Sequence, residues 1–184
     1  NISLNYLKQN GIIEMNDYKR YNALLDFTTQ VHKAVKVGAN VNFSQQDILE
    51  PWLTNDGLVL VIYHSAPTFG PFLPDGSGRI ASNAYPGESQ GQRSFDAVLN
   101  SGSQTTKNYN VNAQAFASVD IMKGLVYDAK AAFTYFDQDY RNRQFPVNSY
   151  YYQPDASGEY KFSDNGTPTF EGLNQNFNKS ITQT

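Results

Sequence analysis

The residue types that most often carry out chemistry are scarce in this sequence. It contains no cysteine, which excludes disulfides, thiolate metal sites and cysteine nucleophiles. Its two histidines, His32 and His64, lack the spacing of a zinc site, and no Gly and Glu follow Asp137 and Asp139 at the spacing of a calcium loop. We therefore expect no enzyme activity, no metal site and no cofactor.

Aromatic side chains in two long segments are better candidates for binding. Such rings offer large rigid faces that could stack on sugar rings or bury against a second protein. They could equally pack the two segments against each other. The candidate contact residues are Trp52, Tyr63, Phe69, Phe72, Tyr150, Tyr151, Tyr152 and Tyr160.

Alternation of apolar and polar residues predicts the strands that must position these rings. From Val35 to Ser44 every odd position is apolar and every even position is polar or glycine, which gives a strand one apolar face. Its ~10 residues suit a tilted strand that crosses a bilayer and exceed the ~5 to 6 residues usual in soluble sheets. This pattern and weaker ones predict strands near 1–6, 19–28, 35–44, 109–119, 125–136 and 179–184.

The connections between these strands alternate in length. Gln30–Lys33 and Asp120–Gly124 are short turns, whereas 45–107 and 137–176 are long segments. Outer-membrane barrels have short periplasmic turns and long extracellular loops, while structureless loops above ~15 residues are uncommon in compact domains. The sequence therefore predicts an all-β fold: one partial domain over 1–184, part of a large antiparallel transmembrane β-barrel of a bacterial outer membrane, with both long loops extracellular.

The two faces of such a wall should differ in chemistry. Aromatic rings near the loop ends of the apolar face should form one girdle at a single height, in the headgroup layer of the bilayer. The girdle residues are Tyr21, Phe43, Tyr109, Phe133 and Tyr135. The opposite face should line a polar lumen, where Leu24 and Phe116 interrupt the pattern. The predicted lumen-facing residues are Asn22, Asp26, Lys36, Asn40, Asn42, Asn112, Gln114, Asp128, Lys130 and Thr134.

Overall charge argues against one class of partner. The formal net charge is −3 and no run of lysine or arginine is present, so no basic surface for nucleic acid is expected. The predicted strands are also too few to close a barrel, because small single-chain barrels need ~8. The first residues, Asn1 to Tyr6, have the pattern of a strand and not that of a signal peptide. We therefore expect the chain to be a piece of a larger barrel.

Several segments also occur in an informative order. Ser3–Ile13, Asp17–Asn22 and Val35–Ser44 are followed by Gly70–Gly76, a proline-rich approach to an Asp-Gly turn. Together they cover roughly the first 76 residues. This ordered set resembles the SusC/RagA family of TonB-dependent outer-membrane transporters, whereas the later strands add only a compatible pattern.

The resemblance implies a barrel of many strands with an amino-terminal plug, covered outside by a SusD-like lipoprotein lid. It also implies that oligosaccharides or peptides are imported with energy relayed by the TonB complex, through parts that this sequence does not contain. Two other functions stay open. A passive outer-membrane porin or a barrel enzyme would have the same strands without a plug. A soluble carbohydrate-binding β-sandwich would require both faces of the strands to be buried or wet.

Overall fold

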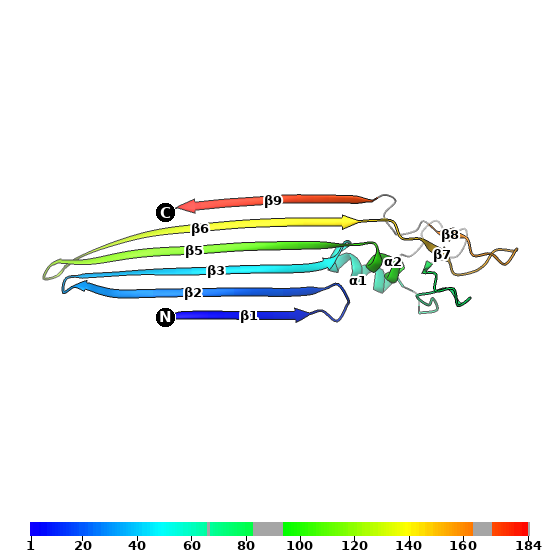
Figure 1. Cartoon of the computed structure of the whole chain (residues 1–184), viewed down its shortest axis with the longest axis horizontal. Coiled ribbons are helices and arrows are strands. Elements are labelled where there is room, and N and C mark those ends of the chain that lie inside the picture. The colour runs from blue at the N-terminus through cyan, green and yellow to red at the C-terminus, as the bar shows by residue number, and fades with distance from the viewer. Residues whose placement is uncertain (66, 83–93, 164–170, 184) are drawn as a thin grey trace.

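Six long strands form one antiparallel sheet, in which each strand pairs with its neighbours in chain order (Figure 1). The computed structural model describes residues 1–65, 67–82, 94–163 and 171–183. The strands are β1 (Ile2–Asn10), β2 (Asp17–His32), β3 (Val35–Pro51), β5 (Gly102–Met122), β6 (Leu125–Gln144) and β9 (Gly172–Gln183). The fold is therefore mostly β, and the sheet is open, with β1 and β9 at its edges.

All six predicted strands exist, but they extend farther than the sequence pattern indicates. The segments predicted as loops at 45–107 and 137–176 begin and end inside strands, because β3 continues to Pro51 and β6 to Gln144. The alternation fades beyond residue 44 because the previously apolar face becomes polar there, as at Asp47. Backbone pairing continues regardless, since it needs no apolar side chains. The predicted boundaries are therefore wrong by several residues at this end.

Two short turns join β2 to β3 and β5 to β6 at the same end of the sheet, which we call the turn end. In the first turn, Gln30 Nε2 donates to the carbonyl of Lys33 at 3.0 Å and the Ala34 amide donates to His32 Nδ1 at 3.3 Å. In the second, Gly124 has φ of 87°, a conformation that favours glycine. Both connections therefore have local causes in the sequence.

The opposite, loop end carries two helices and a second, smaller sheet. The helices are α1 (Thr54–His64) and α2 (Phe95–Asn100). The strands are β4 (Ala81–Ser82), β7 (Ser149–Tyr151) and β8 (Phe162–Ser163), with β4 parallel to β7 and β8 antiparallel to it. Because β4 belongs to the first long loop and β7 and β8 to the second, this sheet joins the two loops (Figure 1).

The small hydrophobic core lies in the loops and not in the long sheet. Leu58 and Val61 of α1 and Val98 of α2 are buried together. Partly buried Ile13, Trp52, Leu53, Phe95 and Leu99 surround them. The side chain of Ser94 caps α2 by accepting a hydrogen bond from the Ala97 amide. In the described ranges, neither helix has the length and apolarity to cross a membrane.

Candidate functional site

Cross-strand register defines an apolar face on the long sheet, because directly paired residues point to the same side. We call the side that carries Val37, Ala39 and Val41 the apolar face. One complete row on this face runs across all six strands and contains only apolar side chains. Its members, from β1 to β9, are Leu4, Ala23, Phe43, Val111, Tyr135 and Ile181.

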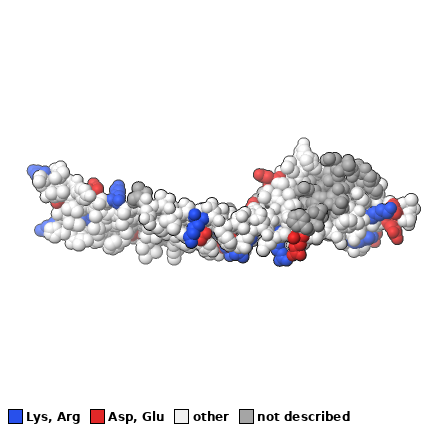
Figure 2. All heavy atoms as spheres, turned by 90° about the horizontal axis from the view of Figure 1, so that it is seen from above, with Lys and Arg blue, Asp and Glu red and all other residues white. Residues whose placement is uncertain are grey.

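The apolar face is open to its surroundings. None of its described residues between Val35 and Phe43 is buried, and Leu4 near one edge is 78% exposed. Figure 2 shows the long sheet from above as a thin layer that thickens toward the loop end. A contiguous apolar surface of this extent is costly in water and marks a site of contact with lipid or protein.

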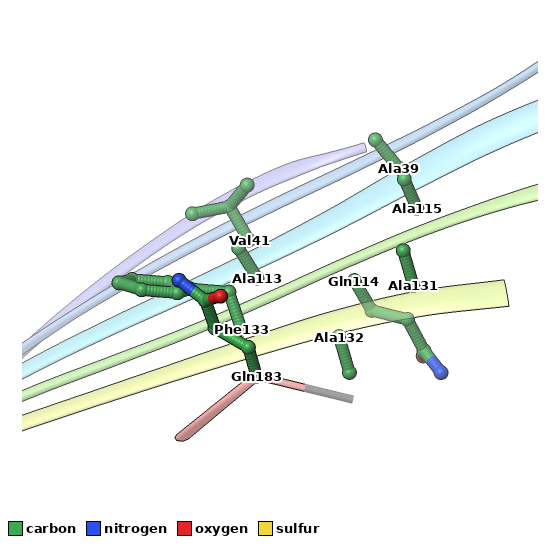
Figure 3. Close-up of a pocket in the computed structure, with 9 residues that line it drawn as sticks. All are labelled: Ala39, Val41, Ala113, Gln114, Ala115, Ala131, Ala132, Phe133 and Gln183. Atoms are coloured by element: carbon green, nitrogen blue, oxygen red, sulfur yellow. The ribbon is translucent and has the colours of Figure 1, made fainter. Parts of the chain in front are cut away.

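A hollow on the apolar face shows how differently adjacent residues are oriented. Figure 3 shows Val41, Ala113 and Phe133 on one side of the strands, whereas Gln114 and Ala132 point to the other. The hollow lies where β9 ends at Gln183, beyond which β6 pairs with β5 on one side and has no described partner on the other. Small alanine side chains line much of it, so the depression reflects their size and does not by itself indicate a ligand site.

The opposite side, which we call the polar face, carries all ten residues predicted to line a lumen. Register places them in rows that cross the sheet: Asn22 pairs with Ser44, Asp26 with Asn40 and Gln114, Asn42 with Asn112 and Thr134, Lys36 with Ser118 and Asp128, and Lys130 with Phe116 and Gly38. Their common face is thus a feature of the structure. That the face lines a lumen stays a prediction.

Polar side chains on the polar face form hydrogen bonds with one another, both along a strand and across strands. Thr134 Oγ1 donates to Asn112 Oδ1 at 3.1 Å, and Asn112 Nδ2 donates to Asn110 Oδ1 at 3.2 Å. Gln138 Nε2 donates to Asn108 Oδ1 at 2.9 Å. The prediction missed Asn108, Asn110 and Gln138, although their two-residue spacing continues that of the residues it included.

The two apolar interruptions of the polar face have different environments. Leu24 pairs with Ser3 and Asn42 and is 38% exposed, so it occupies the polar face without shifting the register. Phe116 lies directly opposite Gly38, and a Cβ built on Gly38 would clash with the Phe116 ring. The absence of a side chain at Gly38 is therefore what makes room for Phe116.

A hydrogen-bond network fixes the first long loop to the loop end of the polar face. Gln104 is buried, donates to Glu50 Oε2 at 3.2 Å and accepts from the Tyr140 hydroxyl at 2.9 Å. Asn142 Nδ2 donates to the carbonyl of Trp52 at 3.1 Å. Because one end of this network is the backbone at the start of the loop, the strands determine where the loop leaves the sheet.

Most candidate aromatic residues of the loops are engaged in packing. Trp52 packs against the core, and its buried Nε1 has no hydrogen-bond partner among the described residues. Phe69 meets Tyr152 edge to face with ring centroids 5.3 Å apart. Phe72 is about half exposed, whereas Tyr63 on α1 is 83% exposed. Among these five residues, Tyr63 is therefore the most accessible for contact with another molecule.

Arg79 connects aromatic residues of both loops. Its guanidinium carbon lies 4.9 Å from the ring centroid of Tyr150 and 5.5 Å from that of Tyr160. Tyr150 also meets Phe162 edge to face, with centroids 6.3 Å apart. Half-buried Tyr151, next in β7, donates its amide to the carbonyl of Lys161 at 2.9 Å. The tyrosine cluster thus stabilises the junction between the loops.

Two aspartates close tight turns in these loops. Ser77 donates its amide to Asp75, and Arg79 pairs with the same carboxylate at 2.6 Å. Hydrogen bonds from Ser77 and then Arg79 lower the pKa of Asp75 to about 2. Hydrogen bonds from Ser157, first, and from the Glu159 amide lower the pKa of Asp155 in the second loop. Both carboxylates are therefore structural acceptors in their turns.

The predicted aromatic girdle is a band and not a single row. Tyr21 and Tyr109 share a row through Gln45, Phe43 and Tyr135 lie in the next row toward the turn end, and Phe133 lies one row beyond. The prediction also missed Tyr6, whose ring centroid lies 4.9 Å from that of Tyr21. Strand pairing thus determines which of these rings share a row, and their common height in a bilayer stays a prediction.

No family model matches this sequence, and no curated protein matches it. The resemblance to the SusC/RagA family therefore rests on the order of motifs in the sequence. No group of three or more His, Asp and Glu residues in the described ranges could hold a metal ion. The candidate site is thus the two-faced sheet together with the loops at its end.

Proposed function

We propose that the long sheet is part of the wall of a transmembrane β-barrel in a bacterial outer membrane. In this arrangement the apolar face contacts lipid, the polar face lines the lumen and the joined loops lie outside the cell. The observation that carries the proposal is a single-layer sheet with one exposed apolar face and one exposed polar face. Strands of outer-membrane barrels alternate in this way.

The length of the apolar band agrees with the thickness of a bilayer. On β3 the band extends from Val35 to the row of Gln45, where Tyr21 and Tyr109 flank that residue. Ten residue steps at about 3.4 Å each give roughly 34 Å along the strand. A tilt of about 35–45° reduces this to roughly 24–28 Å in height, close to the ~25 Å apolar band of outer-membrane barrels.

Two alternative functions either agree less well with the exposed apolar face than a barrel wall does, or have the same sheet. A soluble β-sandwich would cover the apolar face with a second sheet about 10 Å away, but no described residue of that face from Val35 to Phe43 is buried. A passive porin would share the sheet and both of its faces. Solute uptake that stops when TonB is deleted would distinguish an energised importer from a porin.

Within this barrel assignment, we propose that the chain belongs to a SusC/RagA-like importer of oligosaccharides or peptides. The ordered motifs from Ser3 to Gly76 support it. In such an importer, the loops contact a SusD-like lipoprotein, and exposed Tyr63 is the aromatic residue best placed for such a contact. Energy would be relayed by the TonB complex through other parts of the transporter.

Two adjacent residues offer a direct test of the barrel wall. The chain has no cysteine, so Val41→Cys and Asn42→Cys each introduce one labelling site, on opposite faces of β3. In vesicles, we expect a lipid-attached quencher to quench a fluorophore on Cys at 41 and a water-soluble quencher to act at 42. Equal quenching at the two positions, or the reverse pattern, would contradict the proposal.

A further inference from the structure

Three strands repeat the same pair of residues at the loop end of the apolar face. Each pair consists of a tyrosine and a lysine two residues apart, so both side chains point to the apolar face. The pairs are Tyr6 and Lys8 on β1, Tyr21 and Lys19 on β2, and Tyr109 and Lys107 on β5. In each pair the lysine lies nearer the loop end. The three tyrosines share one row, and the three lysines share the next.

These lysines form no ion pair with a carboxylate of the described residues. No Asp or Glu oxygen of the described residues lies within the 4.0 Å limit of an ion pair with Lys8, Lys19 or Lys107. Lys8 and Lys19 are direct cross-strand partners, which places two like charges side by side. Such a pair destabilises a sheet unless an anion lies between the two ammonium groups.

Acidic residues nearby do not neutralise the row. Asp47 lies between Lys19 and Lys107 in the register, but its carboxylate accepts the amide of Gln45 at 3.2 and 3.3 Å. Asp17 of β2, together with Lys19, Asp47 and Lys107, lines a second hollow, at the loop end of the sheet. Asp139 pairs with Lys107 in the register, but it also forms an ion pair with Arg141 at 2.7 Å. The four basic residues, Lys8, Lys19, Lys107 and Arg141, against the three acidic residues, Asp17, Asp47 and Asp139, leave a net charge of +1 (4 − 3).

We propose that this lysine row binds phosphate groups of anionic membrane lipids. The inference rests on the proposed membrane orientation, in which the tyrosine row lies at the boundary of the hydrocarbon and the lysine row lies one step outside it, at the depth of lipid phosphates. A phosphate between Lys8 and Lys19 replaces their mutual repulsion with two attractions. Charge complementarity and continuity with the apolar band thus identify the same occupant.

The test compares two variants that lose the same charge from opposite faces. Lys8→Gln/Lys19→Gln alters the lysine row, and Lys36→Gln/Lys130→Gln alters the polar face. The full protein is reconstituted in vesicles of phosphatidylcholine alone or with a minor proportion of phosphatidylglycerol. After detergent extraction, native mass spectrometry measures the phosphatidylglycerol that each protein retains.

We expect the first variant to bind phosphatidylglycerol about 30-fold more weakly than the wild type, from ~1 kcal/mol per lysine at a membrane surface. The polar-face variant should bind as the wild type does. Equal retention by the wild type and both variants would overturn the proposal while leaving the barrel wall intact. Failure of the wild type to insert into vesicles of either composition would instead refute the barrel wall, and the lipid site with it.

Discussion

Single side chains at the loop end determine how the two long loops are held together. Arg79 pairs with Asp75 in its own loop and lies over the rings of Tyr150 and Tyr160 in the other. A cation over an exposed ring contributes about 0.5–1 kcal/mol, and an exposed ion pair is weak because water screens it. Arg79 therefore stabilises the loop junction modestly, through several weak contacts at once.

The pH dependence of this junction follows from Asp75. Its pKa is about 2 in the folded loop, against 3.8 for an unperturbed aspartate, so its contribution to stability is complete above about pH 4. That contribution should be lost as the pH falls from about 4 toward 2. We expect Arg79→Ala to raise the pKa of Asp75 in a carboxyl NMR titration. Asp155, in the other loop, is the control and should not change, and an unchanged Asp75 would contradict the structure.

At the scale of elements, the pairing of β3 with β5 depends on a complementary pair of positions. Gly38 and Phe116 are direct partners, and the carbonyl of Phe27 would lie 2.9 Å from a Cβ at position 38. A larger side chain at position 38 would displace the Phe116 ring or separate the strands. The bulky residue that interrupts the polar alternation of β5 is therefore accommodated by a glycine on the next strand.

This complementarity predicts a non-additive pair of substitutions. Gly38→Ala alone should destabilise the folded protein by about 1–3 kcal/mol through overpacking. In the background of Phe116→Ala the same change should cost markedly less, because the ring is gone, although the Phe27 carbonyl remains. Denaturant unfolding of the four proteins in a double-mutant cycle measures the coupling. Additive changes in the free energy of unfolding would show that the packing of the Phe116 ring does not depend on Gly38.

At the scale of the whole molecule, no described segment covers the apolar face of the long sheet from Val35 to Phe43, as a second layer does in a soluble domain. The buried apolar residues of the described chain lie mainly in the loops, among them Leu58, Val61 and Val98. The apolar face of the sheet, in contrast, stays exposed. Stability of the sheet must therefore come from backbone pairing and from whatever covers the apolar face. In the proposed function, lipid provides that cover.

Arginine substitutions at two adjacent residues test whether the stability of the sheet depends on lipid. Ala115 lies on the apolar face and Gln114 on the polar face, both near the middle of the band. Arginine on the lipid side at the bilayer midplane costs about 2–4 kcal/mol. Folding into vesicles should therefore be weakened by that amount in Ala115→Arg and little changed in Gln114→Arg. Similar losses of folding free energy in the two variants would argue that both faces contact water, or that both contact protein, to the same extent.

The sequence by itself determined the strands and their two faces, because side chains alternate strictly along an extended backbone. That rule was enough to place Asn40, Gln114 and Thr134 on the same side of different strands. It could not locate the strand ends, since pairing beyond Gln45 continues after the apolar signal stops.

Tertiary structure alone decided what depends on contacts between distant segments. The alignment of the aromatic band required strand register, and Arg79 meets Tyr150 and Tyr160 only because β4 pairs with β7. The row of Lys8, Lys19 and Lys107 likewise combines residues from three strands that no local pattern connects. Such arrangements depend on pairing and packing across long sequence separations, which local periodicity does not encode.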